Sequence, residues 1–214
     1  MPISSRSVSR RDAVLLGVAA PLVLACKTNP APVSSSTAKQ APTPHPPGVC
    51  AATEASIEGP YYRAGAPERS DLAAGLPGVA LEIEGRVTTI DCRTALRDVE
   101  LDVWQANHSG HYDNDGSMPP GSLLLRGRLK TDGDGRYRLK TIVPGRYLNG
   151  KQYRPAHVHV KLRAPGHALL TTQLYFPDDP FNDIDPFIHR ALVMDVKRKD
   201  RVLVARYDFV LRPA

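Results

Sequence analysis

Two histidines, His157 and His159, lie in the part of the chain with the most potential for chemistry, the run Tyr153-Arg154-Pro155-Ala156-His157-Val158-His159. Alternate side chains of a β-strand point to the same face, so both imidazoles are expected to project together while Val158 points to the core. Two imidazoles on one face form half of a metal site. The spacing alone favours a surface pair or a hydrogen-bonded core pair over a metal site, so the case for a metal depends on the surrounding motifs.

The elements that would position this pair are short strands. Runs rich in Val, Leu, Ile, Thr and Tyr, separated by Pro- and Gly-containing turns, predict strands at 79–90, 98–107, 123–130, 136–142, 156–163, 169–176 and 202–211. The Asp-Gly-Asp-Gly turn at 132–135 predicts a hairpin over 129–140. The fold class expected is all-β, a β-sandwich of mostly antiparallel short strands with long loops.

The segments between these strands carry fewer structural signals. A short helix is expected only within 186–199. Turn chemistry explains the acidic clusters at 113–116 and 132–135 better than calcium binding does. The lone tryptophan, Trp104, is predicted to lie in the core, and a solvated loop is predicted for the acids Asp178, Asp179, Asp183 and Asp185.

The first 49 residues are predicted to be an export signal followed by a spacer. Residues 1–25 combine the pair Arg10-Arg11 with a short apolar run, the layout of a bacterial export signal of the twin-arginine type. Val23-Leu24-Ala25-Cys26 resembles a lipobox, in which Cys26 is lipidated. Residues 26–49, rich in Pro, Ser and Thr, predict a tether, and the folded domain is expected at 50–214. The protein is thus expected to be an exported, periplasmic or cell-envelope lipoprotein that meets the membrane only through its anchor.

Cysteine usage and charge agree with this interpretation. With Cys26 lipidated, Cys50 and Cys92 remain, and outside the cytosol two such cysteines are expected to form a disulfide rather than stay as buried thiols. The net charge is +6, of which residues 1–25 contribute +2, from three arginines and one aspartate. The remaining +4 is scattered, so nucleic-acid binding is not expected.

Several motifs, in a fixed order, surround the histidine pair. They are Glu58-Gly59-Pro60-Tyr61-Tyr62, the stretch from Asp102 to Tyr112, Pro144-Gly145-Arg146-Tyr147, the Arg-Pro-Ala-His-Val-His run and Thr172-Gln173-Leu174-Tyr175-Phe176. This series resembles the intradiol ring-cleavage dioxygenases, the family of the protocatechuate and catechol dioxygenases. The likeness runs from Cys50 to Leu211 and is greatest to their secreted, single-domain branch.

The resemblance implies a set of site residues. A non-haem Fe(III) ion would be held by Tyr112, Tyr147, His157 and His159. Arg154 and Gln173 match the family's catalytic arginine and glutamine, and Tyr62 matches a substrate-facing position. Without the resemblance, a surface cation or a salt bridge to one of the acids at 178–185 explains Arg154 equally well. His108 and His111 are rival donors beside Tyr112, but they are expected to be exposed to solvent. Leu148 departs from the Pro-Trp that protocatechuate enzymes carry after the ligand tyrosine, which leaves the substrate open.

The implied reaction is cleavage of a catechol-type aromatic diol by O2, between its two hydroxyl-bearing carbons, to a cis,cis-muconate-type diacid. Tyr147 would serve as ligand and then as base, Arg154 would stabilise negative charge on the ring, and Gln173 would orient the substrate. Two phenolates and a hydroxide balance three positive charges, which favours ferric iron over zinc. The alternatives are a non-enzymatic exported lipoprotein, in which a β-sandwich binding module has lost its metal, and a zinc hydrolase.

Overall fold

The structure is a computed structural model that describes residues 50–73 and 75–214. The predicted export signal at 1–25, the tether at 26–49 and the lipidation site Cys26 lie outside the described residues. Among the residues described, no helix has the length and apolar character needed to cross a membrane.

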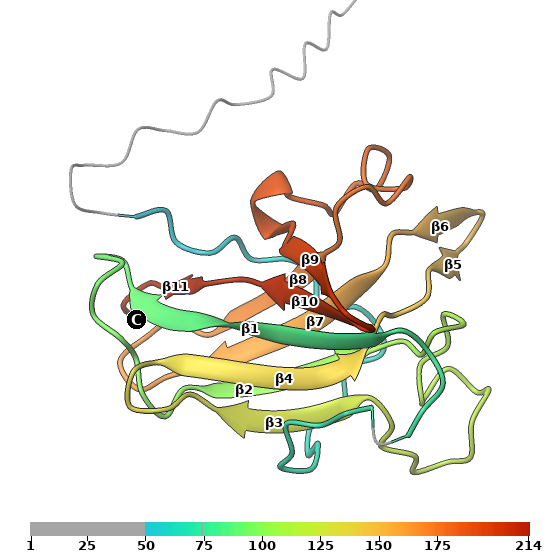
Figure 1. Cartoon of the computed structure of the whole chain (residues 1–214), viewed down its shortest axis with the longest axis horizontal. Helices are drawn as coiled ribbons and strands as arrows, with labels where there is room; N and C mark the ends of the chain where they lie inside the picture. The colour runs from blue at the N-terminus through green and yellow to red at the C-terminus, as the bar shows by residue number, and fades with distance from the viewer. Residues whose placement is uncertain (1–49, 74) are drawn as a thin grey trace, which may run out of the picture. The chain divides into compact units, whose positions relative to one another are not determined.

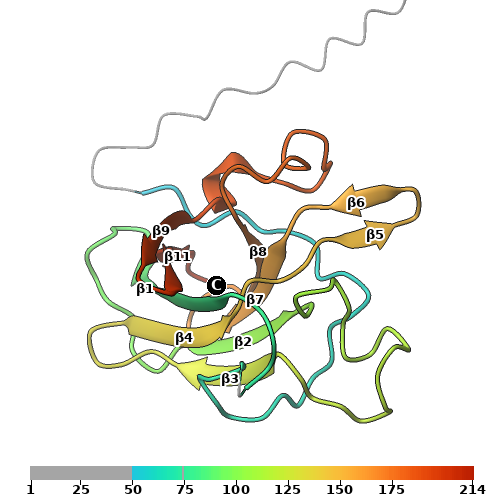
Figure 2. The same ribbon diagram turned by 45° about the vertical axis from the view of Figure 1, so that its right-hand side comes forward.

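Two β-sheets form the body of the molecule (Figure 1). The four-stranded sheet has the order β3 (Arg126–Lys130), β2 (Glu100–Gln105), β7 (His157–Arg163), β8 (Leu170–Tyr175), and all its neighbours are antiparallel. The other sheet is built on β1 (Ala80–Thr89), which pairs with β4 (Arg136–Ile142), β10 (Val202–Arg206) and β11 (Phe209–Leu211), while β9 (Asp195–Lys199) pairs with β10. A separate hairpin, β5 (Tyr147–Asn149) and β6 (Gln152–Arg154), projects beside β7 and β8 (Figure 2).

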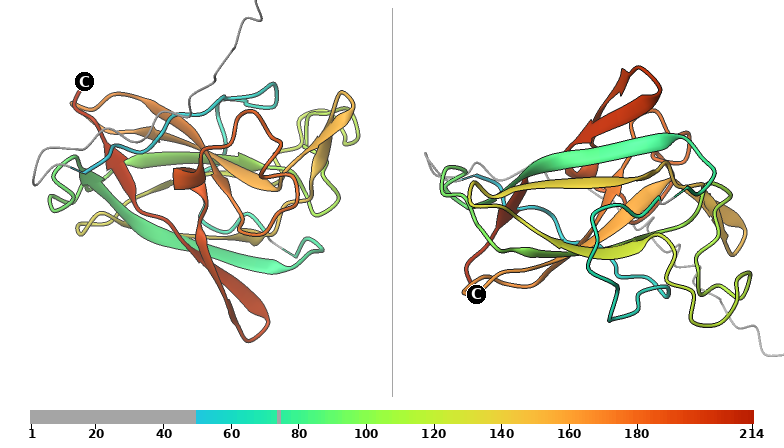
Figure 3. Two further views of the ribbon diagram at one scale, coloured as in Figure 1. Left: turned by 90° about the horizontal axis from the view of Figure 1, so that it is seen from above. Right: turned by 60° about the horizontal axis from the view of Figure 1, so that its bottom comes forward.

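The two sheets enclose one hydrophobic core, as the layers in Figure 3 show. Inward-pointing residues alternate along each strand, as Leu81 and Ile83 do on β1 and Leu101 and Val103 on β2. On β7 the inward set is Val158, Val160 and Leu162. The predicted all-β sandwich is confirmed, and the outward face of β7 is left free to carry the histidines.

Three local predictions need correction. The predicted hairpin at 129–140 is wrong, because β3 joins the four-stranded sheet and β4 joins the other. The turn does form, with Gly135 N donating to Asp132 O, but Thr131 N bonds Val99 O and Val87 N bonds Gly135 O, so the two arms enter different sheets. The helix expected in 186–199 is only a 3-10 turn, Arg190–Leu192, followed by strand β9. The strand predicted over 202–211 is interrupted at 207–208.

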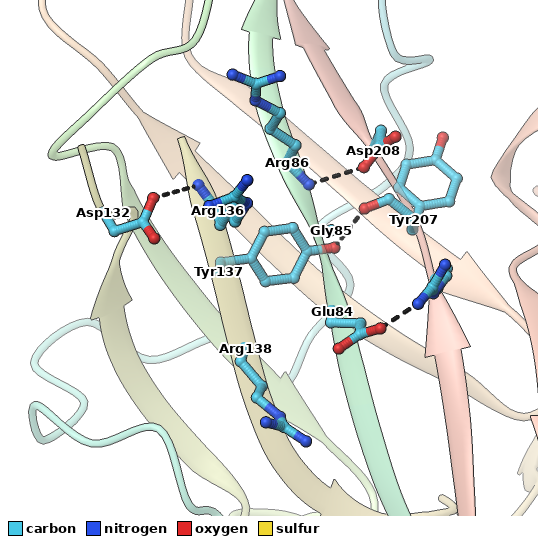
Figure 4. A pocket seen from close by; sticks show the side chains of 10 residues that line it. Glu84, Gly85, Arg86, Asp132, Arg136, Tyr137, Arg138, Tyr207 and Asp208 are labelled. Atoms are coloured by element: carbon cyan, nitrogen blue, oxygen red, sulfur yellow. Dashed lines mark hydrogen bonds and ion pairs between the residues drawn. The ribbon is translucent and has the colours of Figure 1, made fainter. Parts of the chain in front are cut away.

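The interruption lies over Gly85 in β1 and does not shift the register, because Glu84 pairs with Arg206 before it and Val87 pairs with Phe209 after it. A side chain at Gly85 would meet the Tyr207 carbonyl oxygen at 1.7 Å, so only glycine fits there. The Tyr207 carbonyl accepts a hydrogen bond from the Tyr137 hydroxyl at 2.7 Å, and Arg86 N donates to Asp208 at 2.7 Å. The adjoining hollow of about 630 Å³, shown in Figure 4, is lined by charged groups such as Glu84, which pairs with Arg206. These contacts hold the strands of the sheet together, so we give this hollow a structural role.

The predicted disulfide between Cys50 and Cys92 is present, with a Cα–Cα distance of 5.9 Å. It fixes the start of a segment that then runs along β8, where Ser56 N bonds Thr171 O and the Thr172 hydroxyl bonds Glu54 O. This covering segment, residues 50–63, reaches the outward face of the four-stranded sheet. A face that would otherwise be solvated is therefore buried.

Candidate metal centre and active site

The histidine pair lies on the outward face of β7, at the end of the strand that follows the β5–β6 hairpin. His157 and His159 are each 2% exposed. His159 is flanked in register by Trp104 on β2 and Gln173 on β8. Trp104 is buried in a hydrophobic cluster with Ala106 and Tyr112, as predicted, and its ring also stacks on the His159 imidazole with centroids 4.6 Å apart.

The two imidazoles aim at a common point. Their Nε2 atoms lie 3.2 Å apart. His157 Nδ1 donates to the Pro155 carbonyl at 2.7 Å, which leaves a lone pair on its Nε2. Burial lowers the pKa of His157 to about 4, and burial together with His157 lowers the pKa of His159 well below its usual value. Two neutral nitrogens therefore face each other closely, an arrangement that a shared cation stabilises.

Two tyrosines complete the cluster. The Tyr112 hydroxyl lies 3.4 Å from His157 Nε2, and the Tyr112 ring meets the Tyr147 ring edge-on at 5.6 Å. The Tyr147 and His157 rings are also 5.6 Å apart. All four predicted ligand side chains are thus brought together. Tyr112 is 1% exposed, whereas Tyr147 is half-buried at the start of the hairpin.

The electrostatics of the phenols test whether a ferric ion fits here. Burial raises the pKa of Tyr112 well above its usual value and also raises that of Tyr147, where the positive charge of Arg154 acts in the opposite direction. The phenols alone would stay protonated at neutral pH, so ionising them requires a strong cation. Hard phenolate oxygens suit ferric iron, and the two neutral imidazoles suit it as well. The two tyrosines and two histidines therefore form a donor set that fits a ferric ion.

Two glycines hold the tyrosine-bearing loops together. A side chain at Gly110 would meet the Arg146 carbonyl oxygen at 2.2 Å, and one at Gly145 would meet Gly110 N at 2.4 Å. Gly145 N donates to the Asn107 carbonyl at 2.7 Å. Backbone packs directly on backbone, so the loops carrying Tyr112 and Tyr147 are fixed relative to each other.

Arg154 is the buried cation of the site, 3% exposed. Its Nη2 donates to Gln173 Oε1 at 3.0 Å and to the Tyr175 hydroxyl at 3.2 Å. Its Nε donates to Asp185 at 2.7 Å. The expectation that Asp178, Asp179, Asp183 and Asp185 form a solvated loop is therefore wrong for Asp185 and also for Asp179, which are both buried. Each is buried because an arginine, distant in sequence, neutralises it.

Gln173 lies in the row of His159 and is fully buried. Its amide nitrogen donates to the Ile57 carbonyl of the covering segment at 2.7 Å, while its oxygen accepts from Arg154 and Tyr175. It therefore links the covering segment to the arginine. Gln173 thus lies beside the four proposed ligands, as the sequence predicted.

Tyr62 is not placed with the ligand cluster. Its hydroxyl donates to Asp102 at 3.0 Å, and the Lys161 ammonium lies 3.9 Å from its ring centroid. Instead the preceding residue, Tyr61, stacks on Tyr112 with centroids 4.2 Å apart and meets the Tyr147 ring at 5.9 Å. The sequence motif located the segment but not which of the two adjacent tyrosines turns inward.

The rival donors His108 and His111 are both exposed, and His111 Nδ1 is bonded to Asp115 at 3.1 Å. Two residues that the sequence analysis did not assign do belong to the site, Tyr175 and Asp185. Tyr175 was within reach of the sequence, because it stands two positions after Gln173 and shares its face. A salt bridge from Arg154 to one of the acids at 178–185 was an alternative that the sequence offered, but no pattern singled out Asp185 among them.

Both the sequence and the fold are similar to those of known proteins. The sequence profile described as "Dioxygenase" matches residues 57–213. A 6-chlorohydroxyquinol 1,2-dioxygenase of Cupriavidus pinatubonensis is 33% identical over 183 residues, covering 75% of this chain and 65% of the relative. A chlorocatechol 1,2-dioxygenase of the same species is 32% identical, covering 74% of this chain and 69% of the relative. The match to the first thus spans just under two thirds of that relative.

Solved structures give the same answer. The dioxygenase domain of a dioxygenase carbohydrate-binding protein fusion from Streptomyces sp. SirexAA-E superposes with a TM-score of 0.68 at 39% identity, covering 77% of this chain and 100% of that domain. The 3-chlorocatechol 1,2-dioxygenase of Rhodococcus opacus 1CP gives 0.70 at 30% identity, covering 76% of this chain and 73% of that one. With the profile covering most of the chain, the protein belongs to the intradiol ring-cleavage dioxygenase family.

Proposed function

We propose that this protein uses O2 to cleave a catechol-type aromatic diol between its two hydroxyl-bearing carbons, giving a cis,cis-muconate-type diacid. The observation that carries the proposal is the convergence of two neutral imidazole nitrogens, 3.2 Å apart, beside the hydroxyl of Tyr112 and the ring of Tyr147. Family membership and relatives named as 1,2-dioxygenases support it.

The proposed cofactor is a non-haem Fe(III) held by Tyr112, Tyr147, His157 and His159. Such an ion supplies the Lewis acidity that ionises a diol and the redox chemistry that lets the ring react with O2. Two phenolates and one hydroxide balance its charge, so the buried site can be neutral overall, which zinc would not achieve with the same donors. The burial of Tyr112 and His159 favours this neutral combination.

The residues of the chain have separable tasks in this proposal. Tyr147, half-buried on a hairpin edge, is the tyrosine best able to leave its position, and its Oη accepts a proton from the diol. Tyr112 stays fixed within the cluster. The Arg154 guanidinium stabilises negative charge that develops on the ring, and Gln173 holds that guanidinium on one side.

The deciding experiment is spectroscopic and kinetic. Purified protein loaded with ferric iron is expected to be red-brown, with a tyrosinate charge-transfer absorption that shifts when catechol is added. Oxygen uptake with catechol, chlorocatechols and hydroxyquinol then identifies the substrate class, and the diacid is identified by mass spectrometry. Protein that cannot be loaded with iron would favour a binding module, and colourless, fully metallated protein would favour zinc.

Export to the cell envelope is proposed as well, with Cys26 as the lipidated residue. The arginine pair and the apolar run of residues 1–25 support it, and so does the Cys50–Cys92 disulfide, a bond typical of proteins outside the cytosol. Cys26→Ser is expected to move the protein from the membrane fraction to the soluble fraction. An unchanged distribution would reject the anchor without affecting the proposed chemistry.

A further inference from the structure

One loop, residues 177–189, sends two buried carboxylates to the open end of the β5–β6 hairpin, one to each strand. Asp179 accepts from Arg146 Nε at 2.9 Å, just before β5, and from Ala156 N at 3.1 Å. Asp185 pairs with Arg154, the last residue of β6. The hairpin that carries Tyr147 and Arg154 is therefore fixed from a loop that supplies none of the four proposed metal ligands.

The Asp185–Arg154 contact is a two-point one. Arg154 Nε donates to Asp185 Oδ2 at 2.7 Å and Nη2 donates to Oδ1 at 3.2 Å. The carboxylate is itself held by Phe187 N at 2.8 Å, and the guanidinium carbon lies 4.8 Å from the centroid of the Phe187 ring. The two side chains are 3% and 1% exposed, so each charge depends on the other for neutralisation.

This contact fixes the direction in which the rest of the guanidinium points. An arginine side chain is long and loses much rotamer freedom when it is ordered. With its Nε side held by Asp185, the Nη2 of Arg154 is presented to Gln173 and Tyr175. We propose that Asp185 is the positioning residue for Arg154 in ring cleavage, holding the guanidinium where it can stabilise charge on the substrate. This inference rests on the proposed function.

The first test is Asp185→Asn, which keeps the size of the side chain but removes its charge. The kcat for diol cleavage is expected to fall about 10- to 100-fold, as is typical when a group that orients an active-site residue is lost. Iron content and the charge-transfer absorption of the resting protein are expected to stay unchanged, because Asp185 contacts none of the four proposed ligands. Loss of iron together with activity would show a general structural role and overturn the inference.

The same loop offers a matched control. Asp183 pairs with Arg190 at 2.9 Å, but both side chains are 78% exposed. Asp183→Asn removes the same charge from the same loop without touching Arg154, so its kcat is expected to equal that of the wild type. If both variants lose activity equally, the effect belongs to the charge of the loop and the inference fails.

A double-variant cycle shows whether Asp185 acts through Arg154. Arg154→Gln is expected to lower kcat, and adding Asp185→Asn to it is expected to cause no further fall, because the residue to be positioned is already absent. The double variant also leaves no unpaired buried charge, so it is expected to fold even if Asp185→Asn does not. A further fall in the double variant equal to that in the wild-type background would show independent action and overturn the inference.

The two proposals fail in different ways. If iron-loaded wild type cleaves no diol, the proposed function is wrong and the role of Asp185 falls with it. If the wild type is active and Asp185→Asn is equally active, only the positioning role is wrong.

Discussion

Tyr112 and Tyr147 differ in burial, and this difference divides their proposed roles. Tyr112 is enclosed by Tyr61, His157 and the second tyrosine, while Tyr147 stands half-buried on a hairpin edge. Only the latter has room to move away and accept a proton. A pair of chemically identical donors is thus made unequal by position alone.

Removing the hydroxyl of Tyr147 tests that division. Tyr147→Phe is expected to lower kcat about 10²- to 10⁴-fold, the usual loss when a general base is removed. The protein is expected to keep iron through Tyr112, His157 and His159, with a weaker charge-transfer band. Steady-state kinetics and visible absorption provide the two measurements. A kcat within twofold of wild type would exclude Tyr147 as the base.

The histidines make the metal-free protein sensitive to acid. The pKa of His157 is about 4 when folded, against 6.5 as its ordinary value, so between these pH values the unfolded chain binds more protons. Stability is therefore full above pH 6.5 and is lost as the pH falls toward 4, by about 3 kcal/mol for this residue as an upper bound.

Urea unfolding of metal-free protein at pH 7.5 and pH 4.5 measures the effect. The control is His157→Gln, in which the difference between the two pH values is expected to shrink by about that amount. An identical pH dependence in both proteins would show that the imidazole is not buried in its neutral form.

At the scale of elements, the two tyrosine-bearing loops depend on glycine at their contact. Gly145→Ala would push a methyl group against the backbone of Gly110 and His108, and it is expected to cost about 1–3 kcal/mol and to reduce iron retention. The matched control is Gly133→Ala, where nothing lies within 4 Å of the added carbon. Urea unfolding and metal analysis of both variants check this. Equal stability of the two would mean that the close approach has no structural weight.

The sequence predicted the strands and the shared face of the two histidines, because both depend on the two-residue alternation of a β-strand. His157, His159 and Val158 point as the alternation requires, and the site residues carried by the family motifs converge, apart from Tyr62. What did not follow depends on long-range partners. No local sequence pattern shows which sheet each arm of the 132–135 turn joins. Nor does any local pattern show which carboxylate pairs with Arg154, since Asp185 lies 31 positions away.

At the scale of the whole molecule, the disulfide secures the covering segment. It closes a loop with a sequence separation of 42, which corresponds to about 4 kcal/mol in the chain-entropy view. Replacing both Cys50 and Cys92 with serine is expected to lower the free energy of unfolding by about that amount. Urea denaturation measures the change, and a stability equal to that of the wild type would show that hydrogen bonds along β8 hold the segment by themselves.

The alternation along β7 has a consequence for how this site tolerates change. Val158, Val160 and Leu162 belong to the core, while His157 and His159 belong to the chemistry. Point substitutions can therefore tune catalysis without eroding the interior, and the reverse. Inserting or deleting one amino acid within this strand would exchange the two sets, placing the imidazoles in the hydrophobic core and the aliphatic side chains at the proposed metal site. Homologous sequences are therefore expected to differ within β7 by substitutions and not by insertions or deletions.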